Sequence, residues 1–573
     1  MTLEQAAEHA VDSAGAGPGA GPGARPVAGP VDGLLADVWA AAERRTDGEL
    51  ATYIPQLALA DPSTFGLAVA TLDGHVYSVG RIEPFTIQSV SKPFVYALAL
   101  ADCGVDRVLD AVGVEPTGNA FNTISVDGRG RPFNPMVNAG AIVTTSLVAG
   151  GDADEKFGRI LAGLSAFAGR PLDIDETVFA SENETGDRNR AIAFLLRSVG
   201  ALDGDVHAVL AAYFRQCSIS VTARDLAVMA ATLANGGTNP VTGETVVPAW
   251  VVSRVLTVMA TCGMYDFAGE WLYRVGLPAK SGVSGGISAV QPGRLGVGAH
   301  SPLLDRRGNS VRGIAACELL SERLDLHMFA VGGVEPAASI RHALGGDIRS
   351  MRARVARERE VLDAQGRRIV VHTLTGAQDA ASTERVTRAV VADEARGWHV
   401  LDLRRCRRME PSSAALLVRL VEQLRAGGAQ TVLVRPKSVT VRRAIAALSA
   451  SVDAEFADSD DAIRWCEDAL LTGEGLLSGA AAALVPIAEQ DLLAGVSAGT
   501  VAAVEAAAVT RVFAAGSPVF VEGAPSDGLY FVGAGQVSAV VTAGNSTRRL
   551  SSIGPGSSFG ELALIEGGTR SAT

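Results

Sequence analysis

The stretch Gln88-Ser89-Val90-Ser91-Lys92-Pro93 decides the fold of the first half of this chain. It places a serine and a lysine three residues apart, so in a helix the two side chains share one face and the amine reaches the hydroxyl. Because proline is tolerated in the first turn of a helix but not in its interior, Pro93 predicts a helix that begins close to Ser89. The positive end of the helix dipole then favours an alkoxide at Ser89. The same spacing also suits a capped helix start with a solvated lysine.

The scarcity of lysine favours the catalytic interpretation of this stretch. Only four of the 50 basic residues are lysine, namely Lys92, Lys156, Lys280 and Lys437. Arginine stays protonated in proteins, whereas a buried ammonium group can lose its proton and act as a base. Lys92 and Lys280 both lie in short motifs, the second in Lys280-Ser281-Gly282, where a structural role and a direct role are equally favoured.

Three motifs follow one another in a meaningful order. Ser89-x-x-Lys92, Ser181-Glu182-Asn183 and Lys280-Ser281-Gly282 have the order found in penicillin-recognising serine enzymes. Acyl transfer through Ser89 is therefore expected, and a β-lactamase or peptidase that uses the same serine and lysine is one interpretation of it.

Longer strings are more specific about the substrate. Seven of them, in order, closely resemble the serine-dependent glutaminase family: YIPQLA (53–58), QSVSKPFVYALAL (88–100), FNPMVNAGAI (133–142), SENETGDRN (181–189), YFRQCSISVT (213–222), CGMYDFAGEW (262–271) and VGLPAKSGVSGGI (275–287). The resemblance spans residues 34–334. It implies a β-lactamase/transpeptidase-like catalytic domain of the α+β class, which agrees with short strands, an Asp73-Gly74 hairpin signal and long helical stretches.

The resemblance also implies an activity, the hydrolysis of L-glutamine to L-glutamate and ammonia. Ser89 is then the nucleophile, Lys92 its general base and Tyr265 a proton relay, with the backbone amides of Ser89 and Val283 as the oxyanion hole. The implied substrate-binding residues are Tyr53, Ser89, Asn138, Glu182, Asn189, Tyr213, Tyr265 and Val283. No metal or cofactor is implied.

These assignments are physically sensible beside the resemblance. A carboxylate such as Glu182 suits the α-ammonium group, while neutral asparagine and tyrosine donors suit the α-carboxylate without adding charge to a buried site. Taken singly, each residue also has an ordinary structural explanation: a turn or cap for the asparagines, a core position for the tyrosines and a surface position for the glutamate.

Changes in composition predict a multidomain chain of 573 residues. We expect a flexible Gly/Ala/Pro leader over residues 1–33, the glutaminase domain over 34–336 and a solvated helical linker over 337–367. Strands alternating with helices predict a small α/β domain over 368–472, and Gly-punctuated strands predict a mainly-β domain over 485–573.

The α/β domain resembles a STAS domain, of the type found in anti-sigma-factor antagonists, through VLDLRRCRRMEPSSAALLVRLVEQL (400–424). In that family a serine after the acidic residue at the helix start can be phosphorylated. Here Pro411 follows Glu410, so phosphorylation at the usual position is not expected, and Ser412 is an unsupported substitute. A docking module for a protein partner is the favoured role.

The last segment resembles a cyclic-nucleotide-binding domain through FGELALI (559–565) and RSAT (570–573). The resemblance implies that Glu561 takes the ribose 2′-hydroxyl and Arg570 the cyclic phosphate, assisted by backbone amides. Since some members of that fold have lost ligand binding, a cyclic nucleotide ligand and an empty domain both stay open. The sequence stops at Thr573, so we expect this domain to be truncated.

Overall composition excludes several other classes. A net charge of −12 disfavours nucleic acid and an anionic membrane surface as partners, and no apolar run reaches the length of a membrane span. Six scattered cysteines signal neither a zinc site nor a disulfide framework, which favours a reducing cytoplasm. The resemblance implies a homo-oligomer. An inert signalling scaffold is the competing non-enzyme hypothesis, which the retained Ser89, Lys92 and Tyr265 disfavour.

Overall fold

The computed structural model describes residues 29–117, 126–329, 339–392, 397–477, 484–543, 546–565 and 568–573. The expected leader, apart from its last five residues, lies outside them. Contacts divide the chain into two units, residues 1–334 with 383–387, and residues 335–382 with 388–573. Within the described ranges, no helix is long and apolar enough to cross a membrane.

The first unit is built around a five-stranded antiparallel sheet of order β3-β2-β9-β8-β7. Its strands are β2 (Gly66–Thr71), β3 (Val76–Gly80), β7 (Ala279–Ser281), β8 (Gly286–Gln291) and β9 (Leu295–His300). The hairpin expected at Asp73-Gly74 is confirmed, because β2 and β3 pair antiparallel across that turn. Gly296 and Gly298 let α10 (Ala223–Ala234) lie directly on β9, since a Cβ at Gly296 would come within 2.2 Å of the Ala231 nitrogen.

The helix α2 (Pro30–Glu43) corrects the expected domain boundary. It begins at Pro30, four residues before the position predicted, with the proline in its first turn and the Gly29 amide donating to Asp32 Oδ2 at 2.7 Å. Val31, Leu34 and Val38 are buried. The Gly/Ala/Pro composition of the leader hid this start, because the apolar stripe of the helix lies in the residues that follow it.

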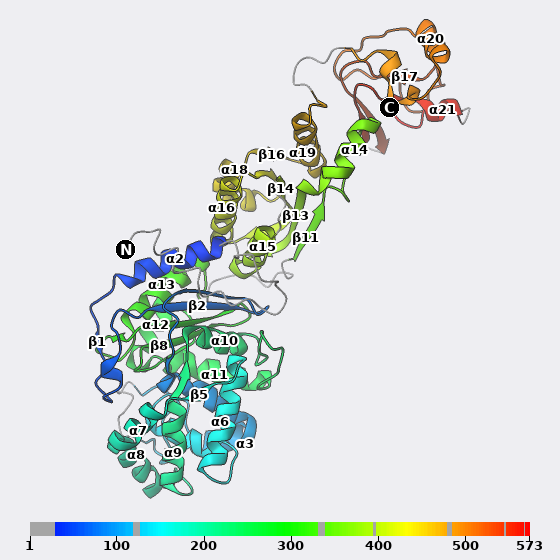
Figure 1. Cartoon of the computed structure of the whole chain (residues 1–573). Helices are drawn as coiled ribbons and strands as arrows, with labels where there is room; N and C mark the ends of the chain where they lie inside the picture. Colours follow the sequence, from blue (N-terminus) through cyan, green and yellow to red (C-terminus); the bar gives the residue numbers. More distant parts are fainter. Residues whose placement is uncertain are drawn as a thin grey trace. The chain divides into compact units, whose positions relative to one another are not determined.

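A helical subdomain continues from the sheet (Figure 1). Its helices are α3 (Lys92–Cys103), α4 (Val105–Ala111), α5 (Asn138–Leu147), α6 (Ala153–Ala168), α7 (Glu176–Thr185), α8 (Asp187–Ser198), α9 (Val206–Cys217) and α11 (Ala249–Cys262). The helix α3 is its axis, since the first nine residues of α3 are all buried. Gly163 of α6 allows close packing on Leu98 of α3, where a Cβ would meet Leu98 Cδ1 at 2.5 Å. The α+β class and the helical subdomain are confirmed.

Short elements complete this unit. They are β1 (Glu49–Leu50) paired with β10 (Leu303–Leu304), the sheet β4-β6-β5 (Phe85–Thr86, Ile219–Val221, Asp173–Ile174), α12 (Ala268–Arg274) and α13 (Val311–Leu324).

The second unit contains a sheet of order β11-β13-β14-β15-β16. The strands are β11 (Ser339–Leu344), β13 (Ile369–Gln378), β14 (Trp398–Met409), β15 (Gln430–Val434) and β16 (Ala454–Phe456). Strands β13 to β16 run parallel, which confirms the expected alternation of strands and helices. The helices are α15 (Ala380–Ala392), α16 (Pro411–Ala426), α17 (Val439–Ala444), α18 (Ala446–Ser451) and α19 (Ser459–Gly473).

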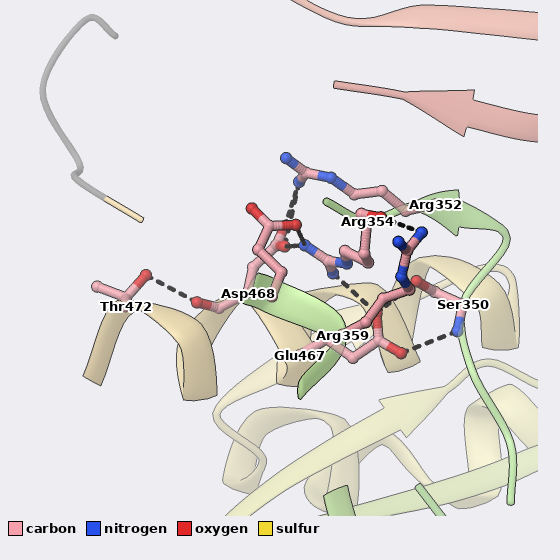
Figure 2. Close-up of polar contacts among 8 residues, drawn as sticks. Ser350, Arg352, Arg354, Arg359, Glu467, Asp468 and Thr472 are labelled. Carbon is pink, nitrogen blue, oxygen red and sulfur yellow. Dashed lines mark hydrogen bonds and ion pairs between the residues drawn. The ribbon is translucent and has the colours of Figure 1, made fainter. Parts of the chain in front are cut away.

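The expected helical linker over 337–367 is wrong in its first two thirds. Strand β11 joins the sheet there by antiparallel pairing with β13, and helix α14 covers only Ala356–Gln365. Arg354 is 7% exposed and bonds Glu467 at 2.8 Å and Asp468 at 2.6 Å, both on α19 (Figure 2). The Ser350 amide and hydroxyl also donate to Glu467. Arg352 and Arg354 therefore serve a partly buried ion-pair cluster that precedes helix α14.

The C-terminal part is small and rich in short strands. Its elements are α20 (Ala498–Ala507), β17 (Tyr530–Phe531), β18 (Val537–Ala543), β19 (Ser546–Ile553), β20 (Ser558–Phe559) and α21 (Glu561–Ile565). Strand β19 pairs with β18 and with β12 (Arg352–Ala353), so the segment before α14 is hydrogen-bonded to this part. Val532, Ile553 and Phe559 form its core.

Candidate active site

Ser89 and Lys92 lie together at the start of α3, as their spacing predicts. A 3-10 turn (Gln88–Ser91) leads directly into the α-helix, and Pro93 occupies its first turn. Lys92 Nζ lies 2.7 Å from Ser89 Oγ. Lys92 is 1% exposed and Ser89 is 7% exposed. The two groups are thus within hydrogen-bond distance and almost completely removed from solvent.

Burial changes the acid–base behaviour of Lys92. Loss of hydration lowers the pKa of its amine to about 8, and only weaker interactions with Cys217 and Glu182 act in the opposite direction. Its other hydrogen-bond partner is neutral, Asn138 Oδ1 at 2.7 Å. A lysine held by neutral groups in an apolar site can accept a proton near neutral pH.

Three of the predicted substrate-binding residues extend this hydrogen-bonded chain. Asn138 begins α5 and donates from Nδ2 to Asn189 Oδ1 at 3.0 Å. Asn189 of α8 donates in turn to the Tyr53 hydroxyl at 3.1 Å. The asparagines are buried, whereas Tyr53 is 37% exposed and marks the solvent side of the site. The chain therefore runs from Lys92 outward through neutral polar groups.

Glu182 and Tyr213 lie in the same environment. Burial raises the pKa of the Glu182 carboxyl to about 7, opposed by a hydrogen bond with Gln88 and by the charge of Lys92. Burial also raises the pKa of Tyr213 well above its ordinary value, with added contributions from Cys217, Tyr53 and Glu182. A buried carboxylate that is costly to ionise gains most from a cationic ligand.

Tyr265 is far from Ser89 in the sequence but is hydrogen-bonded to it in the structure. Its hydroxyl donates to the Ser281 carbonyl oxygen at 3.1 Å, and burial raises its pKa to about 12 against hydrogen bonds to Ser89 and Ser281. Lys280 Nζ lies 3.9 Å from the centroid of the Tyr265 ring and donates to the carbonyls of Gly263 and Ser281. Lys280 thus fixes Tyr265 and β7, which favours its structural role.

Backbone strain also marks this site. Among the described residues, only three besides glycines have positive φ, and two of them are Gln88 at 47° and Tyr265 at 59°. Such conformations cost energy and persist where the surroundings impose them. Gln88 precedes Ser89 in the chain, and Tyr265 is hydrogen-bonded to Ser89.

Val283 lies in the turn between β7 and β8, directly after Gly282, which comes close to Ser89. A Cβ built on the preceding Gly282 would lie 3.4 Å from the Ser89 nitrogen and 3.1 Å from Val90 Cγ2. The turn is closed by the Gly282 amide, which donates to the Gly286 carbonyl at 2.9 Å. At Gly282 the backbone of this turn therefore passes close to the Ser89 amide.

Several residues that the sequence did not single out contact the predicted site residues. Gln88 forms a hydrogen bond with Glu182. Cys217 lies among Tyr213, Glu182 and Lys92, and burial raises the pKa of its thiol to about 12. Ser281 Oγ donates to Asn309 Oδ1 at 2.6 Å. Gln88 and Cys217 both lie inside the quoted strings, which was the available signal. Asn309 lies outside them and had none.

The two candidate nucleotide-binding residues are not equivalent. Arg570 is 2% exposed and is already bonded to Asp527 Oδ1 at 2.8 Å and to the carbonyls of Gly528 and Gly560. Its guanidinium also lies 4.2 Å from the Phe520 ring centroid. Glu561 begins α21 and is exposed.

Comparison with known proteins agrees with this geometry. A family model described as glutaminase matches residues 48–329, and a model of the cyclic nucleotide-binding domain matches residues 510–573. Glutaminase 2 of Bradyrhizobium diazoefficiens is 47% identical over 537 residues, which cover 92% of this chain and 84% of the relative. Glutaminase of Corynebacterium glutamicum is 41% identical, covering 69% of this chain and 91% of its own.

Solved structures agree as well. A probable glutaminase, ybaS, is 40% identical with a TM-score of 0.51, covering 52% of this chain and 98% of that one. The structure of Mglu is 38% identical with a TM-score of 0.52, covering 72% of this chain and 99% of that one.

Proposed function

Because the chain belongs to the glutaminase family, with a β-lactamase-like catalytic domain and a C-terminal cyclic nucleotide-binding domain, we propose that Ser89 and Lys92 carry out its hydrolysis of L-glutamine. Neutral Lys92 accepts the proton of Ser89 Oγ, and Oγ attacks the side-chain amide carbon. The carbon–nitrogen bond breaks, ammonia leaves with an added proton, and water hydrolyses the resulting ester to glutamate. The observation that carries the proposal is the 2.7 Å distance between Lys92 Nζ and Ser89 Oγ in a buried site.

Tyr265 and the turn at Val283 support this reaction. A hydroxyl with a raised pKa remains protonated, so Tyr265 relays a proton between Ser89 and the leaving nitrogen without ionising. The Ser89 and Val283 amides stabilise the oxyanion, and one such donor typically contributes about 3 to 4 kcal/mol to lowering the barrier.

The polar chain described above supplies the substrate site. Glu182 pairs with the α-ammonium group of the substrate. The positive charge of that group lowers the pKa of the Glu182 carboxyl and so favours its ionised form. Tyr53, Asn138, Asn189 and Tyr213 bind the α-carboxylate and the remainder of the amino acid as neutral donors and acceptors. Because these four residues are neutral, they do not stabilise the protonated form of Lys92. A lysine or arginine in their place would compete with the α-ammonium group of the substrate for Glu182.

Purified full-length protein offered L-glutamine or a β-lactam tests the proposal. We expect ammonia release from glutamine, no β-lactam turnover and loss of activity in Ser89→Ala but not in the control Ser146→Ala. Added hydroxylamine should divert part of the product to a γ-glutamyl hydroxamate, because it attacks the same acyl-enzyme. β-Lactam turnover without ammonia release, or full activity of Ser89→Ala, would reject it.

For the C-terminal domain we propose a cyclic nucleotide as ligand, with Arg570 exchanging Asp527 for the cyclic phosphate and Glu561 taking the ribose. The matching family model supports this, as does the presence of both Glu561 and Arg570 at the expected positions; Arg570 is at present bonded to Asp527. Titration of the full chain with cAMP and with cGMP, followed by melting temperature, should give a rise that Arg570→Gln abolishes. An unchanged melting temperature with both nucleotides would contradict the proposal.

For residues 339–473 we propose a STAS-like docking module for a protein partner. The parallel sheet supports this, as does the alignment with Mglu, which covers more of this chain than the catalytic domain supplies. Ser412 and Ser413 are buried at the start of α16, which fits poorly with phosphorylation there. A homo-oligomer and a cytoplasmic location complete the proposal, the latter supported by six unpaired cysteines. Sedimentation of the purified protein tests the oligomer.

A further inference from the structure

A cavity of about 580 Å³ lies at one end of the sheet in the second unit. Its lining comes from two neighbouring strands, β13 and β14, and from the loop that follows β15: Thr375, Gly376, Arg404, Arg405, Cys406, Arg407, Lys437 and Ser438. Val434 is the last residue of β15 and pairs with Asp402 of β14, so Arg404–Arg407 extend past the end of β15. The cavity is therefore at the carboxyl end of parallel strands, where open α/β sheets bind their ligands.

The lining is strongly cationic. Arg404 is compensated, because it bonds Asp402 at 2.8 Å and Asp458 at 3.1 Å. In the described part of the chain, the side chains of Arg405, Arg407 and Lys437 form no ion pair or hydrogen bond. These three exposed cations face one cavity although the chain as a whole has a net charge of −12.

The shape of the cavity fits a small ligand. Strand β13 has register shifts on either side of Thr375 and Gly376, and Gly376 has a φ of 79°, a conformation that favours a residue without a Cβ. No side chain therefore stands at that point of the lining. The volume is within the range of sites for small molecules, about 300 to 1,000 Å³.

We propose that this cavity binds a small anion that carries phosphate groups. Guanidinium groups bind phosphate oxygens through paired hydrogen bonds, and lysine adds a point charge. Binding relieves the repulsion among Arg405, Arg407 and Lys437. This site is separate from the candidate cyclic nucleotide site at Arg570 and from the site at Ser89, and it does not depend on either.

Inorganic pyrophosphate is the probe, titrated into the full-length protein at constant ionic strength by calorimetry and by melting temperature. We expect saturable binding and a higher melting temperature. The triple variant Arg405→Gln/Arg407→Gln/Lys437→Gln should bind at least about tenfold more weakly. It should keep its melting temperature without ligand, because the three side chains are exposed.

The control is Arg367→Gln, which removes one positive charge just before β13 and hence at the opposite end of the sheet. It should bind pyrophosphate as the wild type does. Three results would each overturn the proposal: no saturable binding by the wild type, equal binding by the triple variant, or an equal loss in the control.

Discussion

Replacing Lys92 with arginine keeps the positive charge but removes the base. At pH 7 an amine with a pKa of about 8 is neutral in roughly one molecule in ten, whereas arginine stays protonated. A positioned general base contributes about 10²- to 10⁴-fold to a rate. The kcat/KM of Lys92→Arg for glutamine at pH 7 should therefore fall at least about 100-fold.

The pH dependence of the wild type has a defined sign. The active form of Lys92 is neutral, so kcat/KM should rise with pH until about 8 and then level off. Ionisation of Glu182, whose pKa is raised to about 7, makes the rise steeper below that pH. The arginine variant should lose the inflection near 8, because its side chain does not titrate there.

Ammonia release across this pH range provides the assay, with Lys156→Arg as the matched control. Lys156 lies on α6 and donates to the carbonyls of Ser146 and Val148, away from Ser89. The control should keep near-normal activity. Should Lys92→Arg retain activity within tenfold of the wild type, or should the wild type show no inflection near pH 8, the role of Lys92 is refuted.

Three further outcomes are expected. Glu182→Gln should raise the KM for glutamine by about 10- to 100-fold, since a charged hydrogen bond contributes about 1.5 to 3 kcal/mol; an unchanged KM would reject its contact with the ammonium group. Arg354→Ala should lower the free energy of unfolding by about 3 to 5 kcal/mol by leaving buried Glu467 without its cationic partner, as measured by denaturant titration, and a loss below about 1 kcal/mol would contradict this. Burial and two neighbouring histidines hold the pKa of His372 well below 6.5, so the unfolded chain binds more protons as pH falls below that value. The melting temperature should drop there, less so in His372→Leu; an equal drop would exclude His372 as its source.

The catalytic domain was predictable because its chemistry is encoded locally. The spacing of Ser89 and Lys92 requires one helical turn, and Pro93 restricts where that helix begins. The contacts of Asn138 with Lys92 and of Asn189 with Tyr53 join segments that are distant in the sequence, so only the family resemblance indicated them.

The errors arose where long-range contacts override local pattern. Arg352 and Arg354 belong to a densely charged stretch that predicts a solvated helix, but their partners Glu467 and Asp468 lie more than a hundred residues later. The pairing of β11 with β13 also joins segments separated in the sequence, so the local sequence of β11 does not predict it. The positive φ of Gln88 is imposed by its buried surroundings and has no signature in the residue itself.

Mass spectrometry of enzyme quenched in acid during turnover of isotopically labelled glutamine tests the central claim most directly. A γ-glutamyl ester on the peptide that contains Ser89, absent from Ser89→Ala, is the predicted result. Label on another nucleophile such as Cys217, or glutamate formation with no ester on Ser89 at any quench time, would contradict the account.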